Sequence, residues 1–79
     1  MNEQVLLNGF QVWVFVVELD DGLRIRLSLD DWERCQLHRG QRIPLQRQGR
    51  PEASLFLAEA VEMPPVAWFV LENGMRMAG

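Results

Sequence analysis

The one cysteine and the one histidine are the side chains best suited to nucleophilic or metal chemistry. Cys35 and His38 stand three residues apart, a spacing that places both on one face of a helix. A zinc site takes three or four ligands from more than one element, and Asp31 or Glu33 would have to complete it. A thiol near a helix C-terminus has a raised pKa, which disfavours a nucleophile. We therefore expect a buried thiol beside a solvent-facing histidine, without a metal or a cofactor.

Two carboxylate pairs invite a catalytic interpretation, but local structure explains both of them. Asp20-Asp21 precedes Gly22 and is typical of a turn, whereas Asp30-Asp31 stands where a helix begins and its N-terminus needs caps. The glycines are single and widely spaced, so the sequence has no loop that would hold a phosphate. These patterns predict a protein that is not an enzyme and has no catalytic residues.

The basic residues are unevenly distributed. All eight are arginine, which is typical of a GC-rich bacterial genome, and residues 34–50 contain five of them and no acid. Residues 1–33 contain seven acids and two arginines, and the chain has a net charge of −3. Two interpretations stay open. The favoured one is a solvated edge paired with neighbouring acids. The other is an anion or nucleic-acid site formed by Arg39, Arg42, Arg47 and Arg50.

Single-strand binding by a small barrel uses aromatic side chains beside its basic groove. No aromatic residue lies between Arg34 and Arg50, and Trp32 and Phe56 have the pattern of core residues. The pI of about 5.0 also disfavours a dedicated nucleic-acid domain. Nucleic acid is therefore the second choice of partner.

Short apolar segments between turn residues predict a mainly β fold. We expect five strands at residues 10–19, 23–29, 41–47, 53–61 and 66–71, with one short helix over residues 28–40 after the second strand. This outline is that of a small five-stranded SH3-like or OB-like barrel, and an α+β two-layer sheet is the alternative. Pro44 suggests that the third strand lies at an edge.

The turn around Gly22 determines which side of the first hairpin faces inward. A three-residue loop with Gly22 in the left-handed region pairs Leu19 with Leu23 and Val17 with Ile25, and it separates apolar from charged residues. We prefer this register. Trp13 and Phe15 then point into the core, and the outer face contains Val12, Val14 and Val16, which need a cover.

The helix has clear sequence signals at both ends. Its capping box is formed either by Ser28 with Asp31 or by Asp30 with Glu33, and Gly40 stands where a helix-terminating glycine belongs. Its apolar residues share one face and are expected to pack on the barrel: Leu29, Trp32 and Cys35, with Leu37 at the end.

A second apolar signal follows Pro64-Pro65. Trp68 and Phe69 are adjacent in a predicted strand, so one of them must face away from the core. Together with Val12, Val14 and Val16 they form more apolar surface than one small barrel covers. We expect homodimerisation or docking onto a protein partner through these five residues.

The composition is consistent with one small domain. The chain has 79 residues, of which 48% are hydrophobic, and residues 73–79 are expected to be frayed. A lone cysteine is typical of a reducing compartment, and the start of the chain shows no basic signal region. The longest uncharged run, residues 4–17, is too short and polar to span a bilayer. We therefore expect a cytoplasmic protein with no membrane partner.

A sequence motif common in small barrels, L-x-x-G-x-x-[VI]-x-[VL], occurs at residues 37–45, ahead of an apolar run at residues 55–57. In this motif the chain resembles the TOBE-type OB-like domains that accompany ABC-transporter ATPases and molybdate-binding proteins. The resemblance covers only this part of the chain, and the motif also occurs in unrelated folds. It implies a barrel and, with it, a site for a small oxyanion.

Overall fold

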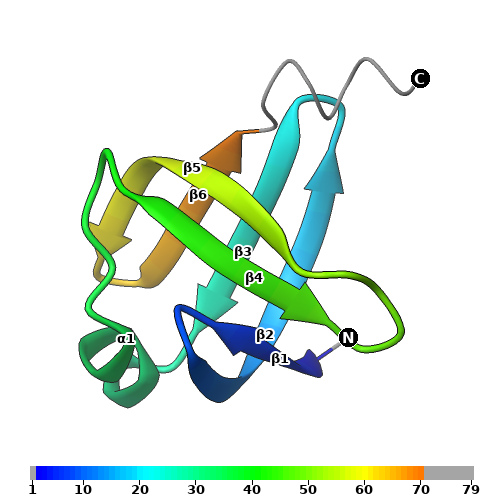
Figure 1. The fold of residues 1–79 in the computed structure, drawn as a ribbon. Coiled ribbons are helices and arrows are strands. Elements are labelled where there is room, and N and C mark those ends of the chain that lie inside the picture. The colour runs from blue at the N-terminus through cyan, green and yellow to red at the C-terminus, as the bar shows by residue number, and fades with distance from the viewer. Residues whose placement is uncertain (1, 71–79) are drawn as a thin grey trace.

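Six antiparallel strands close into a barrel, and one short helix lies at one end of it (Figure 1). The structure is a computed structural model that describes residues 2–70. Its elements are β1 (Asn2–Leu7), β2 (Phe10–Leu19), β3 (Gly22–Leu27), α1 (Leu29–Cys35), β4 (Arg42–Arg47), β5 (Ala53–Glu62) and β6 (Pro65–Val70). The spatial order is β1-β2-β3-β6-β5-β4. The predicted class, a small mainly β barrel with one short helix, is confirmed, with one strand more than expected. Residues 73–79, predicted to be frayed, lie outside the described part.

The additional strand is β1, which closes the barrel by pairing with β2 on one side and β4 on the other. Val5 and Leu7 point into the core, and the polar residues before them hide this alternation in the sequence. Asn8 and Gly9 both have positive φ, as a two-residue hairpin turn between β1 and β2 requires. The backbone N–H of Asn8 donates to the Pro44 carbonyl at 2.9 Å. Because β4 has partners on both sides, the prediction that Pro44 marks an edge strand is wrong.

The predicted register of the first hairpin is also wrong. The turn consists of Asp20 and Asp21, and Leu19 pairs with Gly22, so that Val14 lies opposite Leu27. Even-numbered residues of β2 therefore face inward. Gly22 does not have the positive φ that we expected. Glycine is needed at this position for close packing, because a Cβ on residue 22 would overlap the carbonyl oxygen of Phe69 on β6.

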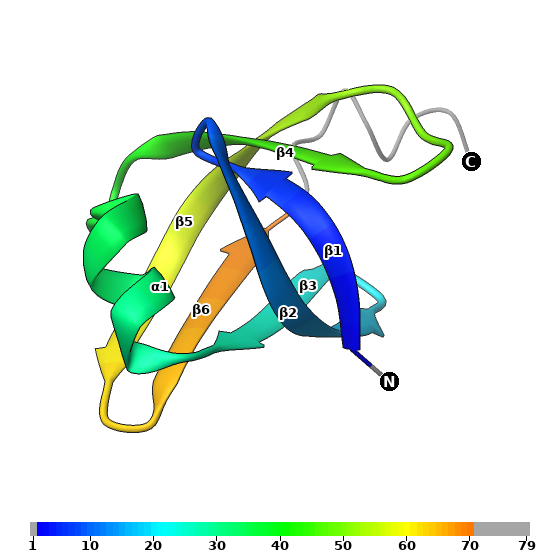
Figure 2. The ribbon, with the colours of Figure 1, turned by 90° about the horizontal axis from the view of Figure 1, so that it is seen from below.

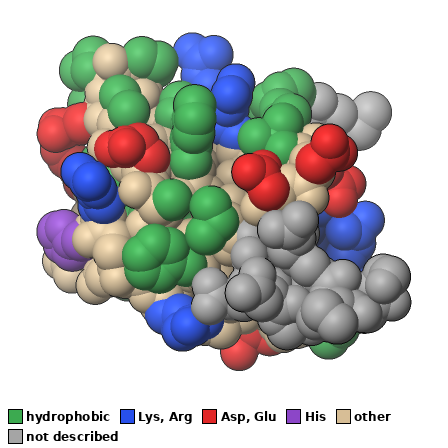
Figure 3. Space-filling view, turned by 90° about the horizontal axis from the view of Figure 1, so that it is seen from above, with side chains coloured by type: hydrophobic (Ala, Val, Ile, Leu, Met, Phe, Trp, Pro, Cys, Tyr) green, Lys and Arg blue, Asp and Glu red, His purple; other side chains and the backbone are tan. Residues whose placement is uncertain are grey.

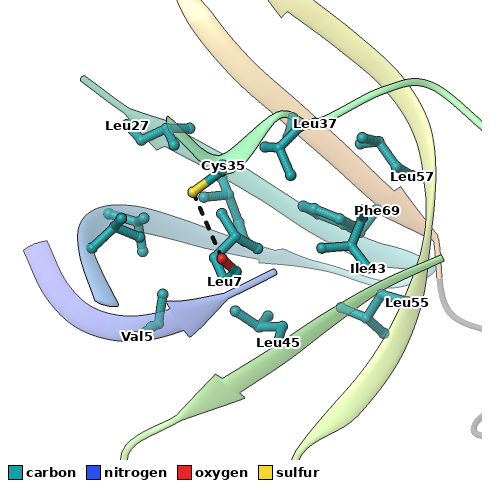
Figure 4. Close-up of a cluster of buried hydrophobic side chains, with 14 of the residues drawn as sticks. Val5, Leu7, Leu27, Cys35, Leu37, Ile43, Leu45, Leu55, Leu57 and Phe69 are labelled. Atoms are coloured by element: carbon teal, nitrogen blue, oxygen red, sulfur yellow. Dashed lines mark hydrogen bonds between the residues drawn. The ribbon is translucent and has the colours of Figure 1, made fainter. Parts of the chain in front are cut away.

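The core is a single cluster of apolar side chains inside the barrel (Figure 4). Every strand contributes inward residues at alternate positions, and the described part of the chain has no buried polar or charged residue. Ile43 and Leu45, predicted to face inward, are buried as expected. The core members are Val5, Leu7, Val12, Val14, Ile25, Leu27, Trp32, Cys35, Leu37, Ile43, Leu45, Leu55, Leu57, Ala67 and Phe69.

Helix α1 closes one end of the barrel (Figure 2). Of the two predicted caps, Ser28 is the one formed, since its side chain accepts from the Asp31 amide at 3.1 Å. The helix ends at Gln36, whose φ of 52° is left-handed, so Gly40 does not terminate it as predicted. Trp32, Cys35 and Leu37 are buried, whereas Leu29 is exposed. Among the residues described here, no helix is long and apolar enough to cross a membrane.

Candidate binding face

The arginines predicted to form an anion site do not gather at one place. Arg39 lies in the loop after α1 and Arg42 begins β4, whereas Arg47 ends the strand, about 17 Å further along it. Arg47 donates from Nε to Glu3 Oε1 at 2.8 Å. Its Nη1 also lies 3.6 Å from a Glu18 carboxylate oxygen.

Arg50 shares the Glu18 carboxylate, with an Nη1 to Oε1 distance of 3.9 Å. Arg47, Arg50 and Glu18 line a hollow of about 200 Å³ at the open end of the barrel. Two arginines there face two carboxylates, counting Glu3, so the local charge is balanced. For Arg47 and Arg50 this is the acid-paired arrangement that the sequence analysis favoured, although the Arg47 side chain is only 16% exposed and is not solvated as expected.

The predicted apolar surface is also rearranged. Val12 and Val14 are 2% and 1% exposed, and Val16 packs against the core, so none of the three forms an outer face. Phe69 is buried as well. Trp68 alone of the five predicted residues is outside the barrel, where 43% of it is exposed.

The residues that do face outward on these strands form what we call the aromatic–arginine face. It comprises Trp13, Phe15 and Val17 of β2, Arg24 and Arg26 of β3, and Val66 and Trp68 of β6. The strand pairing aligns them in two rows across the barrel. One row is Phe15, Arg26 and Val66, and the next is Val17, Arg24 and Trp68. Two arginines therefore stand in the middle of the face, with aromatic side chains on both sides.

The two arginines have different surroundings. The Arg24 guanidinium lies over the Trp68 ring, 4.5 Å from its centroid, which is a cation–π arrangement. Arg26 lies between two adjoining hollows that also share Phe15. Neither arginine has an ion-pair partner among residues 2–70. The face therefore presents positive charge that the described part of the chain does not neutralise.

The aromatic–arginine face contains two hollows. The larger one, about 660 Å³, is lined by Trp13, Phe15, Arg26 and Ser28, and extends to Asn2 and Asp31. The smaller one, about 230 Å³, lies between β2, β3 and β6 and includes Val17 and Val66. Both are partly open to solvent on the outside of the barrel, so they suit side chains of a bound macromolecule more than an enclosed small molecule.

Acidic residues limit the face on two sides. Asp31 closes the end of the larger hollow and is paired with Arg34. Glu59 of β5 lies opposite Trp68 in the strand register. On the side of the molecule drawn in Figure 3, hydrophobic side chains are interspersed with acidic and arginine side chains. Phe56, expected in the core, is 36% exposed and adds to the outer apolar surface of β5.

The structure places Cys35 in the core and His38 at the surface, as expected. The Cys35 thiol donates to the Leu7 carbonyl at 3.6 Å (Figure 4). Burial, and secondarily the Asp31 carboxylate, raise the thiol pKa from 9.0 to about 11. A neutral, enclosed thiol is a poor nucleophile and a poor ligand. The described residues contain no cluster of three His, Cys, Asp or Glu side chains able to hold a metal.

Comparison with known proteins returns no relative: no family model, curated protein or solved structure matches the chain. The function must therefore be inferred from the chemistry of the residues themselves. The sequence pattern identified Trp68 as a site residue but missed the other six members of the face. Trp13, Phe15 and Val17 had a signal in the second apolar set on β2, but the wrong register assigned this set to the core.

Proposed function

We propose that this protein is a non-enzymatic cytoplasmic module that binds another protein through the aromatic–arginine face. The supporting observation is that Trp13 and Trp68, 60% and 43% exposed, flank two arginines that have no acidic partner among residues 2–70. Tryptophan and arginine are the residues most enriched where binding energy concentrates in protein interfaces. Here they stand on paired strands of a closed barrel, so little conformational entropy is lost when a partner binds.

The test is site-specific photo-crosslinking in the cells that make the protein. A photoreactive amino acid replaces Trp13 in one variant and Leu6 in a matched control, because Leu6 is similarly apolar, 42% exposed and on β1 outside the face. We expect a defined adduct from position 13 and none from position 6. Equal adducts from both positions, or none from position 13, would refute docking at this face.

A second function is favoured by a different feature of the same surface, namely arginines interleaved with aromatic rings. This combination also binds single-stranded nucleic acid, by ring stacking and phosphate contacts. In that case Arg24 and Arg26, rather than residues 39–50, would provide the charge. Affinity for a labelled oligonucleotide would then fall steeply between about 50 and about 200 mM salt.

A further inference from the structure

We infer that the partner segment that binds the aromatic–arginine face is an extended peptide with acidic side chains two residues apart. This inference rests on the proposed function and specifies its ligand. Four features of the molecule support it: the spacing of the two arginines, the closure of the barrel, the size of the face and its charge.

The spacing of Arg24 and Arg26 defines the ligand pattern. Side chains two residues apart on a strand point the same way and are separated by about 7 Å. An extended peptide lying along β3 has the same repeat, so carboxylates at positions i and i+2 meet the two guanidinium groups in turn. Arginine is suited to such contacts because its planar fork donates two hydrogen bonds to one carboxylate.

The closed barrel determines how such a peptide binds. Every strand of the barrel has hydrogen-bonded neighbours on both sides, so a peptide does not extend the sheet as an added strand. It must instead lie across the outer side chains. The larger hollow, beside Trp13 and Ser28, continues the line of Arg24 and Arg26 along β3. An apolar residue of the peptide, two positions beyond an acidic one, fits there.

The size of the face favours a peptide over a second copy of this chain. The face extends about 14 Å across three strands and about 17 Å along them, or roughly 240 Å² in projection. A stable globular interface covers about 800 Å² on each partner. One extended segment covers the face, whereas a second barrel would have to reach well beyond it.

Charge also disfavours a symmetric dimer at this place. A two-fold axis brings the same patch of both copies together, so arginines of one copy would meet those of the other. Such like-charge contacts are unfavourable. The face instead complements negative charge, which a partner segment with two carboxylates supplies.

Two acidic groups make a short acidic peptide a better ligand than a nucleic acid. Asp31 lies at one end of the larger hollow, and Glu59, on β5, lies opposite Trp68 of β6. A ligand with two carboxylates places its charge between these acids. A nucleic acid that continues past either end brings further phosphates towards them, and the chain as a whole has a net charge of −3.

The probe that tests this inference is a labelled peptide, Leu-Thr-Glu-Thr-Glu-Thr-Leu, whose leucines and glutamates share one side when it is extended. One control has glutamine in place of both glutamates. A second, Leu-Thr-Glu-Glu-Thr-Thr-Leu, keeps the charge but puts the carboxylates on opposite sides. An oligothymidylate is the third ligand. Fluorescence anisotropy with the full-length protein gives each affinity.

We expect the alternating peptide to bind up to about 30-fold more tightly than the glutamine peptide and up to about fivefold more tightly than the spacing control, because each exposed ion pair contributes up to about 1 kcal/mol and the spacing control loses one pair rather than two. Arg24→Gln/Arg26→Gln should remove this preference, whereas Arg39→Gln, at an exposed site off the face, should keep it. Far-ultraviolet circular dichroism of each variant verifies that it is folded.

Three results would overturn the inference. They are equal affinity for the glutamate and glutamine peptides, equal affinity for the two glutamate spacings, and binding of the oligothymidylate alone. A dimeric mass by light scattering that Trp13→Ala abolishes, without peptide binding, would show that the face takes a second copy. In each case a crosslink at position 13 would still support the proposed docking, so the two hypotheses fail separately.

Discussion

Replacing neighbouring residues of β2 tests which side of the strand faces the core. Val14 is 1% exposed, so Val14→Asp puts a carboxylate into a core that has no polar group to receive it. An unpaired buried charge costs several kcal/mol even after relaxation. A core of this size rarely supplies more than about 3–5 kcal/mol of net stability. We expect Val14→Asp to be unfolded.

Trp13→Asp is the matched substitution on the other side. Trp13 is 60% exposed, so the change removes contact from about 80 Å² of a side chain of about 200 Å², worth at most about 2 kcal/mol at about 25 cal/mol per Å². This variant should remain folded, with reduced stability. Urea denaturation followed by far-ultraviolet circular dichroism measures both variants. A folded Val14→Asp beside an unfolded Trp13→Asp would refute the register and, with it, the position of the face.

Three further predictions concern the core, the contact between β3 and β6, and the aromatic–arginine face. The thiol pKa of Cys35 is raised from 9.0 to about 11, so the unfolded chain ionises at lower pH than the folded protein. The neutral buried thiol therefore contributes about 2–3 kcal/mol to the free energy of unfolding below pH 9, and this contribution is lost as the pH rises through 11. Urea denaturation of the wild type against Cys35→Ala should show this loss, and parallel pH profiles would contradict it. Gly22→Ala should lower stability by about 1–3 kcal/mol or more, because its Cβ meets the Phe69 carbonyl, and an unchanged melting temperature would contradict that close approach. A double-mutant cycle of Arg24→Gln with Trp68→Leu should give a coupling of about 0.5–1 kcal/mol, and zero coupling would mean that the stacked pair is absent in solution.

Local sequence signals predicted the barrel because they depend on turns and composition. The breakers that separate the strands and the Ser28 cap of α1 act over a few residues, so the class and most of the strand boundaries were accessible. β1 was missed because Asn2, Glu3 and Gln4 leave only Val5 and Leu7 to show alternation. Its pairing with β2 and β4 is a tertiary property. Barrel closure thus stabilises a segment with weak strand propensity.

The site was less predictable than the fold because β2 has two apolar sides. Valines alternate there with aromatic residues, so either set satisfies a period of two, and a shift of one residue exchanges them. The choice depends on Gly22, which the sequence pattern assigns to the turn. In the structure it is the residue that lets β3 approach β6. A glycine needed for close approach has the same sequence signature as one needed for its φ.

The core is complete without Trp13 and Trp68, which supports our proposal that these two exposed side chains serve binding rather than folding. The inward residues of all six strands and of α1 already fill the barrel, without a buried polar group in the described part of the chain. Closure of the barrel also pairs both sides of all six strands in residues 2–70, so these strands leave no open edge to cover. Folding therefore does not require two large rings on the outer surface beside two arginines that the described residues leave without an ion-pair partner. Partial exposure of such rings is unfavourable in water, and a bound partner removes that cost. This is the physical reason to look for the function on the aromatic–arginine face rather than inside the barrel.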